Sequence, residues 1–222
     1  MNTRTIIAAT SLAVMAATAQ AREPWTDDVT SRTQALALLQ SLNADLLSHP
    51  SATLTLERWC GAHALAPEVK IVARRVKGQD KPLPDDERAA LGIGPGEPVR
   101  YRRVQLACGE HVLSEADNWY VPARLTPEMN RLLKTTDTPF GRAVQPLQPY
   151  RQTFGAELLW QPLPEGWERR SGAALCGTAK EPLAPPPFLF EHRAVLYDSA
   201  RRPFSEVSER YTQEILAKPE LP

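Results

Sequence analysis

The sequence has few of the residues that build metal sites and disulfide-rich folds, and it has no excess of positive charge. Its 222 residues include 3 cysteines and 4 histidines, and 26 basic residues are balanced by 26 acidic ones. The histidines are scattered without metal-ligand spacing, so we expect no metal site. A neutral chain is also unlike general nucleic-acid or anionic-membrane binders, whose affinity comes largely from basic patches. We therefore expect no nucleic-acid partner.

Two common catalytic motifs are also missing. Gly92, Gly94 and Gly96 do not follow a predicted strand, so they are typical of turns and not of a phosphate-binding loop. Ser114 lacks the strand–turn–helix context of a nucleophilic serine. These absences argue against a nucleotide-binding enzyme and against a serine hydrolase.

The first 21 residues have the pattern of a secretory signal peptide. Arg4 precedes a mostly apolar run at 6–17 that is too short to span a bilayer, and Ala19-Gln20-Ala21 fits a cleavage site. An uncleaved N-terminal anchor is the alternative interpretation. No later segment approaches about 18 apolar residues in a row. We expect cleavage after Ala21 and one periplasmic or secreted domain, at 22–222, that has no membrane segment.

The three cysteines leave the disulfide pairing open. In an oxidising compartment one pair among Cys60, Cys108 and Cys176 could close, which would leave the third thiol free. The sequence does not indicate which pair this is.

Periodicity predicts a mixture of helices and antiparallel strands. Leucines at three- and four-residue spacing predict a helix over 27–48, and the following proline at position 50 ends it. The other expected elements are helices at 51–60, 85–91 and 126–134, and strands at 69–76, 99–108, 111–121, 190–197 and 203–211. The stretch 157–188 is rich in proline and is expected to be a loop insertion. We predict an α+β domain with a single antiparallel sheet and helices covering one face.

The clearest local signal is a β-hairpin. The strands at 99–108 and 111–121 are joined by Gly109-Glu110, a pair suited to a tight two-residue turn. We expect Cys108 to lie opposite His111. Along antiparallel strands one residue number rises as its partner's falls, so a regular pairing would keep the sum of each pair at 219, as in 108 and 111.

This regular register assigns side chains to the two faces of the hairpin. It places Arg103 opposite Ala116, on one face with Gln105, Ser114 and Asn118, because side chains alternate along a strand. Arg102 and Asp117 then pair on the other face. The polar face around Arg103 is typical either of a solvated surface or of a polar cavity.

The hairpin and several other segments resemble a known family. The segment LGIGPGEPVRYRRVQLACGEHVLSEADNWYVP resembles bacterial chorismate pyruvate-lyase, and also the effector-binding domain of GntR-type regulators, which shares its fold. The segments LLSHPSAT, TPFG and RRPFSEVSERY resemble further parts of the lyase. The resemblance implies a chorismate lyase-like domain that encloses a small ligand cavity.

The resemblance also implies roles for individual residues. Arg103 would hold the carboxylate of the ligand, backbone groups near Ala52 and Phe140 would close over it, and Glu206 would be the catalytic carboxylate. Glu209 is a rival for that role. Ser114, Asn118 and Gln105, which the regular register places on the face of Arg103, complete the predicted substrate-binding set. The lyase reaction requires no cofactor.

Two functions follow as hypotheses. One is an exported lyase that eliminates pyruvate from chorismate, or from a related enolpyruvyl compound, to give a hydroxybenzoate. The other is a non-catalytic periplasmic binding protein for a small aromatic carboxylate. Both hypotheses have a small-molecule carboxylate as the partner, and we expect a monomer. The usual form of the regulator does not fit, because a signal peptide stands where its DNA-binding helices would be.

Overall fold

The computed structural model describes residues 25–78, 80–94, 96–170 and 181–218. The predicted signal peptide and Cys176 lie outside the described residues, so their predictions stay predictions. Within the described part, no helix is long and apolar enough to cross a membrane.

The chain forms five α-helices and six β-strands in the described ranges. The helices are α1 (Val29–Ser48), α2 (Ala52–Ala62), α3 (Asp85–Ala90), α4 (Pro127–Thr135) and α5 (Phe140–Ala143). The strands are β1 (Ile71–Val76), β2 (Arg100–Cys108), β3 (His111–Tyr120), β4 (Tyr150–Leu158), β5 (Phe188–Tyr197) and β6 (Pro203–Thr212). Short 3-10 turns lie between them at Pro122–Arg124, Gln145–Leu147 and Trp167–Arg169, and another, Gln213–Leu216, follows β6.

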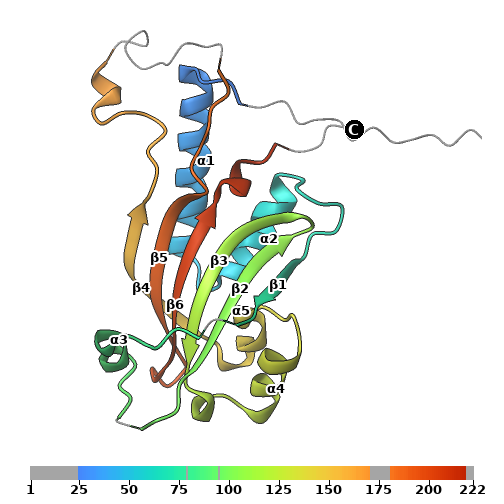
Figure 1. The fold of residues 1–222 in the computed structure, drawn as a ribbon, viewed down its shortest axis with the longest axis vertical. Helices are drawn as coiled ribbons and strands as arrows, with labels where there is room; N and C mark the ends of the chain where they lie inside the picture. Colours follow the sequence, from blue (N-terminus) through green and yellow to red (C-terminus); the bar gives the residue numbers. More distant parts are fainter. Residues whose placement is uncertain (1–24, 79, 95, 171–180, 219–222) are drawn as a thin grey trace, which may run out of the picture.

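The strands form one antiparallel sheet in the order β1-β2-β3-β6-β5-β4. Figure 1 shows α1 and α2 behind the sheet and α3 beside its lower end. The predicted α+β class with a single antiparallel sheet is therefore confirmed. We call the side that α1 and α2 pack against the covered face, and the opposite side the open face.

The covered face holds the main core, and local sequence signals explain how its helices begin. Asp28 caps α1 by accepting a hydrogen bond from the Ser31 N–H, and Ser51 caps α2 by accepting one from the Leu54 N–H. The leucine stripe of α1 is buried against β-strand side chains such as Val104. Burial of this apolar stripe is what holds the helix on the sheet.

A smaller apolar cluster covers one end of the open face. Leu83 and Leu91, which flank α3, pack there with Trp119 of β3 and Val195 of β5. The Trp119 indole N–H donates to the Lys81 carbonyl at 2.9 Å, which ties this segment to the sheet. The open face is therefore apolar at one end and charged along most of its length.

The β2–β3 hairpin has the predicted turn, but its predicted register is wrong beyond the first pairs. Cys108 does pair with His111, and Gly109 has a φ of +54°, which glycine tolerates well. A β-bulge then shifts the pairing between Leu106 and Ala107. Beyond it, Arg103 pairs with Asp117 and not with Ala116. The bulge adds one unpaired residue to β3. Residues of β2 beyond it therefore lie on the opposite face, relative to β3, from the one that the regular register predicts.

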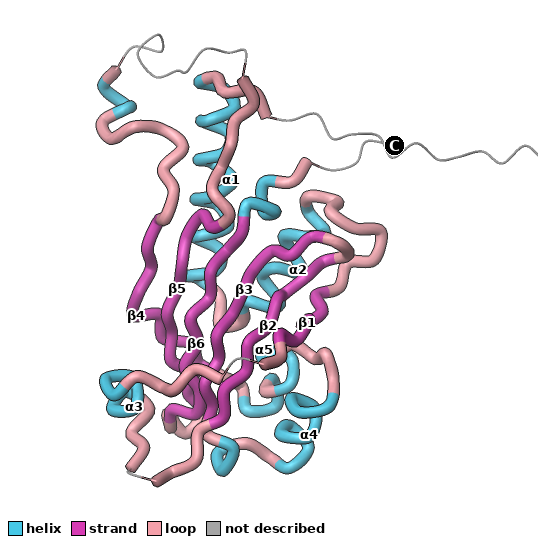
Figure 2. Tube along the Cα trace, in the orientation of Figure 1, coloured by secondary structure: helices cyan, strands magenta, loops and turns pink. Residues whose placement is uncertain are grey.

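The structure also settles the disulfide and adds a strand that the sequence did not indicate. Cys60 of α2 is bonded to Cys108 of β2, so the helix layer is covalently tied to the sheet. β4 was not predicted. It is the edge strand beside β5 (Figure 2), and its side chains are largely exposed or half-buried. A strand with little buried surface carries no clear alternation.

Candidate functional site

A small, partly open cavity lies between the covered face and the beginnings of α2 and α5. We call it the closed pocket. Its volume is about 40 Å³, which is room for a few water molecules. Its lining side chains come from β2, β3, β4, β5 and β6 and from the segments around Ser51 and Phe140. They are Pro50, Ser51, Ala52, Thr53, Arg102, Val104, Leu106, Ala116, Asn118, Phe140, Gly141, Arg151, Leu196, Val207 and Glu209.

Arg102 is the least compensated charge of the closed pocket. The residue is 7% exposed, and its Nη2 donates to the Thr138 carbonyl at 3.0 Å. Its Nε and Nη1 atoms are buried and have no hydrogen-bond partner among the described residues. Burial lowers the pKa of Arg102 to about 10, so the guanidinium remains charged at neutral pH. This leaves two charged donors available to an anion.

A second buried cation in the pocket is already paired. The Arg151 Nη2 lies 2.7 Å from the Glu209 Oε2, and both side chains are less than a tenth exposed. The Tyr211 hydroxyl donates to the same carboxylate at 3.1 Å. Burial acts to lower the pKa of Arg151, but the charge and hydrogen bond of Glu209 together with Tyr211 outweigh it and raise that pKa. The pocket thus contains two guanidinium groups and one carboxylate.

Asn118 is a neutral polar group of the pocket lining, and His192 is a neutral group on β5 opposite the lining residue Glu209. Asn118 donates to the Ser205 hydroxyl at 2.7 Å, while its own side-chain oxygen is buried without a partner in the described structure. His192 pairs with Glu209 across β5 and β6, and its Nε2 lies 2.7 Å from the Asn43 side-chain oxygen. Burial lowers the pKa of His192 to about 4, so its ring is neutral at pH 7.

Close packing of two chain segments forms the apolar wall of the pocket. A Cβ atom added to Gly141 would lie 3.0 Å from the Ser51 hydroxyl oxygen and 3.1 Å from that of Thr53. Glycine therefore allows the start of α5 to approach the start of α2. The Phe140 ring contacts Tyr120 at a centroid distance of 5.6 Å. Ala52 and Phe140, both predicted from the resemblance, do line the pocket.

The prediction that Arg103 points into this pocket is wrong, because the β-bulge places it on the open face. The Arg103 guanidinium donates to Glu115 at 3.0 Å and lies 4.0 Å from Asp117. Gln105 shares this face and donates to Glu115 at 3.0 Å. Of the predicted polar set, Asn118 lines the pocket, and Ser114 is fully buried on β3 without being part of the lining.

The register of β6 decides between the two candidate glutamates. Glu209 pairs with Ala116 and lines the closed pocket. Glu206 pairs with Trp119, and both side chains lie on the open face. Glu206 is fully buried there, 3.7 Å from the Arg193 guanidinium. The prediction of Glu206 as the carboxylate of the pocket is therefore wrong, and its rival Glu209 takes that position.

Sequence reasoning also missed Arg102 and Arg151 as pocket residues. Arg151 lies on β4, the strand without a sequence signal, and Arg102 was assigned to the wrong face by one residue of register. For the ranges that the structure describes, no group of three His, Cys, Asp or Glu residues could hold a metal ion.

The fold and the pocket define an α+β domain with a buried, incompletely compensated cationic site. No family profile matches the chain. The chain is 56% identical over 199 residues to the protein of Sinorhizobium fredii named "Uncharacterized protein y4mC". The match covers 89% of this chain and 83% of that protein. It therefore belongs to the same family as that protein.

Solved structures of regulators show a distant likeness. PhnF from Mycobacterium smegmatis has a TM-score of 0.46 at 15% identity, and the match covers 86% of this chain and 84% of that chain. A GntR-family transcriptional regulator from Bacillus cereus has a TM-score of 0.39 at 12% identity, covering 68% and 98% respectively. These likenesses are too distant to assign a ligand or a reaction.

Proposed function

We propose that this protein binds a small carboxylate molecule in the closed pocket, with Arg102 as the principal donor. The observation that supports the proposal is the buried guanidinium with two donor atoms that no described residue satisfies. An unpaired buried charge costs several kcal/mol, and an anionic partner would offset this cost. A carboxylate is a suitable partner because its two oxygens match the planar fork of arginine.

The remaining pocket groups suit a ligand that also carries a hydroxyl or amine. The free side-chain oxygen of Asn118 can accept one hydrogen bond from such a group. Leu106, Val207 and other apolar side chains provide surface for a ring or an aliphatic body. The volume of about 40 Å³ is too small for an aromatic ring, so binding requires the pocket to widen. A hydroxybenzoate is still a suitable probe of the site, because it carries both a carboxylate and a hydroxyl.

A lyase acting on chorismate or a related enolpyruvyl compound is the second candidate, and the presence of Glu209 beside the two arginines favours it. An elimination that releases pyruvate needs a group that moves a proton as well as cations that hold the substrate carboxylates. In this pocket Glu209 would take that role and not Glu206. The binding function is the better supported of the two, because the Glu209 Oε2 atom already accepts hydrogen bonds from Arg151 and Tyr211.

We also propose that the chain is exported and cleaved after Ala21. The Cys60–Cys108 disulfide supports this proposal, because disulfides persist mainly in oxidising compartments. Intact-mass measurement of the protein from its native host tests it. A mass that includes residues 1–21 in a cytosolic fraction would contradict export.

The functional test is a pair of measurements on the purified mature protein. Calorimetric titration with 4-hydroxybenzoate should show saturable binding with one site per chain. Incubation with chorismate, followed by detection of 4-hydroxybenzoate and pyruvate, separates the two candidates. Turnover that falls by about 10²-fold or more in Glu209→Gln would establish the lyase. Binding without turnover would establish the binding protein, and neither binding nor turnover would refute both.

A further inference from the structure

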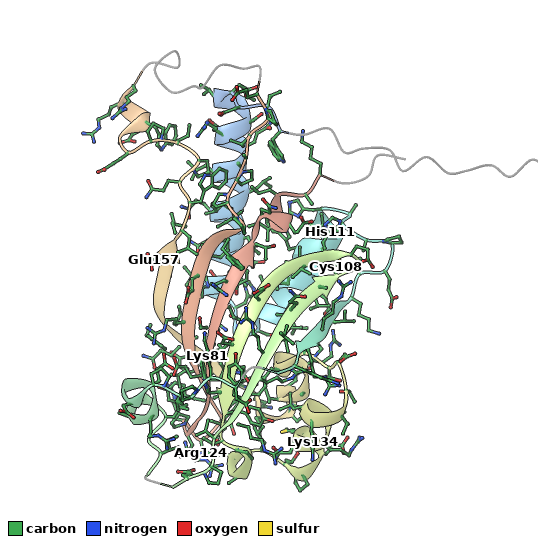
Figure 3. All side chains as sticks on the ribbon, in the orientation of Figure 1. Lys81, Cys108, His111, Arg124, Lys134 and Glu157 are labelled. Atoms are coloured by element: carbon green, nitrogen blue, oxygen red, sulfur yellow. A yellow bond between two sulfur atoms is a disulfide. The ribbon has the colours of Figure 1, made fainter. Side chains whose placement is uncertain are left out.

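A second and much larger concavity opens beside the closed pocket, and its lining is strongly basic. We call it the basic groove. Its volume is about 780 Å³, and it is formed by the end of β1 and the following residues, by the start of β2 and by the end of α4. The cationic residues that line it are Arg75, Lys77, Lys81, Arg100, Arg102, Arg103 and Lys134. Figure 3 shows Lys81 and Lys134 lower in the molecule than Cys108 and His111.

The charge of the basic groove is only partly compensated. Its lining includes seven cationic residues and one acidic residue, Asp80. Arg75 pairs with Asp137 at 3.2 Å, and Lys81 pairs with Asp117. Lys77, Arg100 and Lys134 are exposed and form no ion pair with any residue that the structure describes. A chain with no net charge has therefore concentrated positive charge in one concave region.

Arg102 is the second observation that points to a ligand. It lines the basic groove as well as the closed pocket, so it stands at the boundary between them. The residue is more than nine-tenths buried, and two of its three nitrogen atoms lack a partner in the described ranges. A patch of lysines and arginines that is only solvated does not require a buried, unpaired guanidinium at its base, because burial of an unpaired charge is costly.

We propose that the basic groove is a second binding site, specific for small molecules with several negative charges. Lys77, Arg100 and Lys134 would meet the anionic groups at the rim, and Arg102 would meet the group that reaches the base. The volume lies in the range of small-molecule sites, which favours a compact ligand. Phosphorylated and polycarboxylated molecules share this chemistry. The proposal shares Arg102 with the closed pocket but goes beyond it, because the rim residues Lys77, Arg100 and Lys134 do not line that pocket.

The test is calorimetric titration of the mature protein with two probes, inorganic pyrophosphate and citrate, at about 0.15 M salt, where weak surface attraction is largely screened. The groove variant is Lys77→Ala/Arg100→Ala/Lys134→Ala. The matched control is Lys70→Ala/Arg131→Ala/Arg169→Ala, which removes three exposed cations outside the groove. Arg131 lies on α4 with Lys134, so the two variants also alter the same helix.

We expect saturable binding of at least one probe, weakened more than tenfold in the groove variant and less than threefold in the control. Pyrophosphate alone would indicate a phosphate-bearing ligand, citrate alone a polycarboxylate, and either result supports the site. Equal weakening in both variants, or no binding to the wild-type protein, would overturn it. If the triple variant does not fold, Lys134→Ala and Arg131→Ala form the same comparison. A protein that binds pyrophosphate or citrate but not 4-hydroxybenzoate would refute the closed pocket alone, and the reverse would refute the groove alone.

Discussion

The two faces of the β2–β3 hairpin each carry an arginine, but only the open face also carries acidic side chains that pair with it. On the open face, Arg103 meets Glu115 and Asp117, and Lys81 and Tyr101 donate to Asp117. On the covered face, Arg102 is more deeply buried and meets one backbone carbonyl. Of these two neighbouring arginines, Arg103 is therefore paired with carboxylates, whereas Arg102 keeps hydrogen-bond donors without a partner among the described residues.

This difference separates charges that serve stability from charges that are available to a ligand. A partly exposed network whose charges are paired has little electrostatic energy left to offer a new partner. A buried guanidinium with unmade hydrogen bonds is expensive to keep, and such groups in native proteins call for an explanation. Ligand binding supplies one for Arg102, whereas Arg103 needs none.

The largest expected effect is on stability and comes from the buried pair of the covered face. Glu209→Ala leaves the Arg151 guanidinium buried without its partner, which should lower the free energy of unfolding by about 3–5 kcal/mol. Urea denaturation measures this change. The matched open-face variant is Glu115→Ala, which removes a partly exposed partner and should cost about 1 kcal/mol or less. Equal losses in the two variants would contradict the contrast between the faces.

A somewhat smaller loss is expected when the covered face loses its covalent tie. The Cys60–Cys108 disulfide closes a sequence separation of 48 residues between α2 and β2. Its reduction should lower the free energy of unfolding by about 2–4 kcal/mol. Denaturation with and without a reductant, with the Cys60→Ala/Cys108→Ala variant as control, checks this. A reductant effect that persists in the variant would show that the disulfide is not its source.

The two faces should also lose stability in different pH ranges. Burial lowers the pKa of His192 to about 4 from its ordinary value of 6.5. Between these values the unfolded chain binds a proton that the folded chain does not, so stability falls as the pH drops from about 6.5 to about 4. His192→Gln should flatten this part of the stability profile. An unchanged profile would show that the histidine is protonated normally in the folded protein.

The open face should respond only at lower pH. Burial acts to raise the pKa of Asp117, but hydrogen bonds from Lys81 and Tyr101 outweigh it and hold that pKa below 3.8. The stabilisation is present above the ordinary pKa and is lost as the pH falls through the lowered one. Asp117→Asn should therefore remove part of the loss below about pH 4 and leave the range above it unaltered. A change confined to higher pH would contradict this assignment.

Much of the fold followed from periodic patterns and turn chemistry. The leucine spacing predicted α1, and Gly109-Glu110 predicted the hairpin turn with Cys108 opposite His111. β4 could not be predicted in the same way, because an edge strand with few buried side chains leaves no alternation in the sequence.

Some of the predicted site residues do lie around one pocket, but the predicted charged residues do not. Ala52, Phe140 and Asn118 do line the pocket. The bulge that moved Arg102 onto the covered face was not predicted, because the sequence analysis continued the pairing regularly from the turn, whereas Leu113 is left without a partner on β2. The choice of Glu209 over Glu206 depends on pairing between strands far apart in sequence, which no local pattern encodes.

The most direct test of the account compares the two neighbouring arginines as binding residues. Calorimetric titration with 4-hydroxybenzoate should be performed on the wild-type protein, on Arg102→Ala and on Arg103→Ala, with thermal melts to show that all three are folded. The account predicts that Arg102→Ala weakens binding by more than tenfold, because a charged hydrogen bond to the carboxylate is worth about 1.5–3 kcal/mol. Arg103→Ala should change the affinity by less than about twofold, since its charge is already satisfied. The opposite order, with binding lost in Arg103→Ala and retained in Arg102→Ala, would contradict the assignment of the covered face as the ligand site.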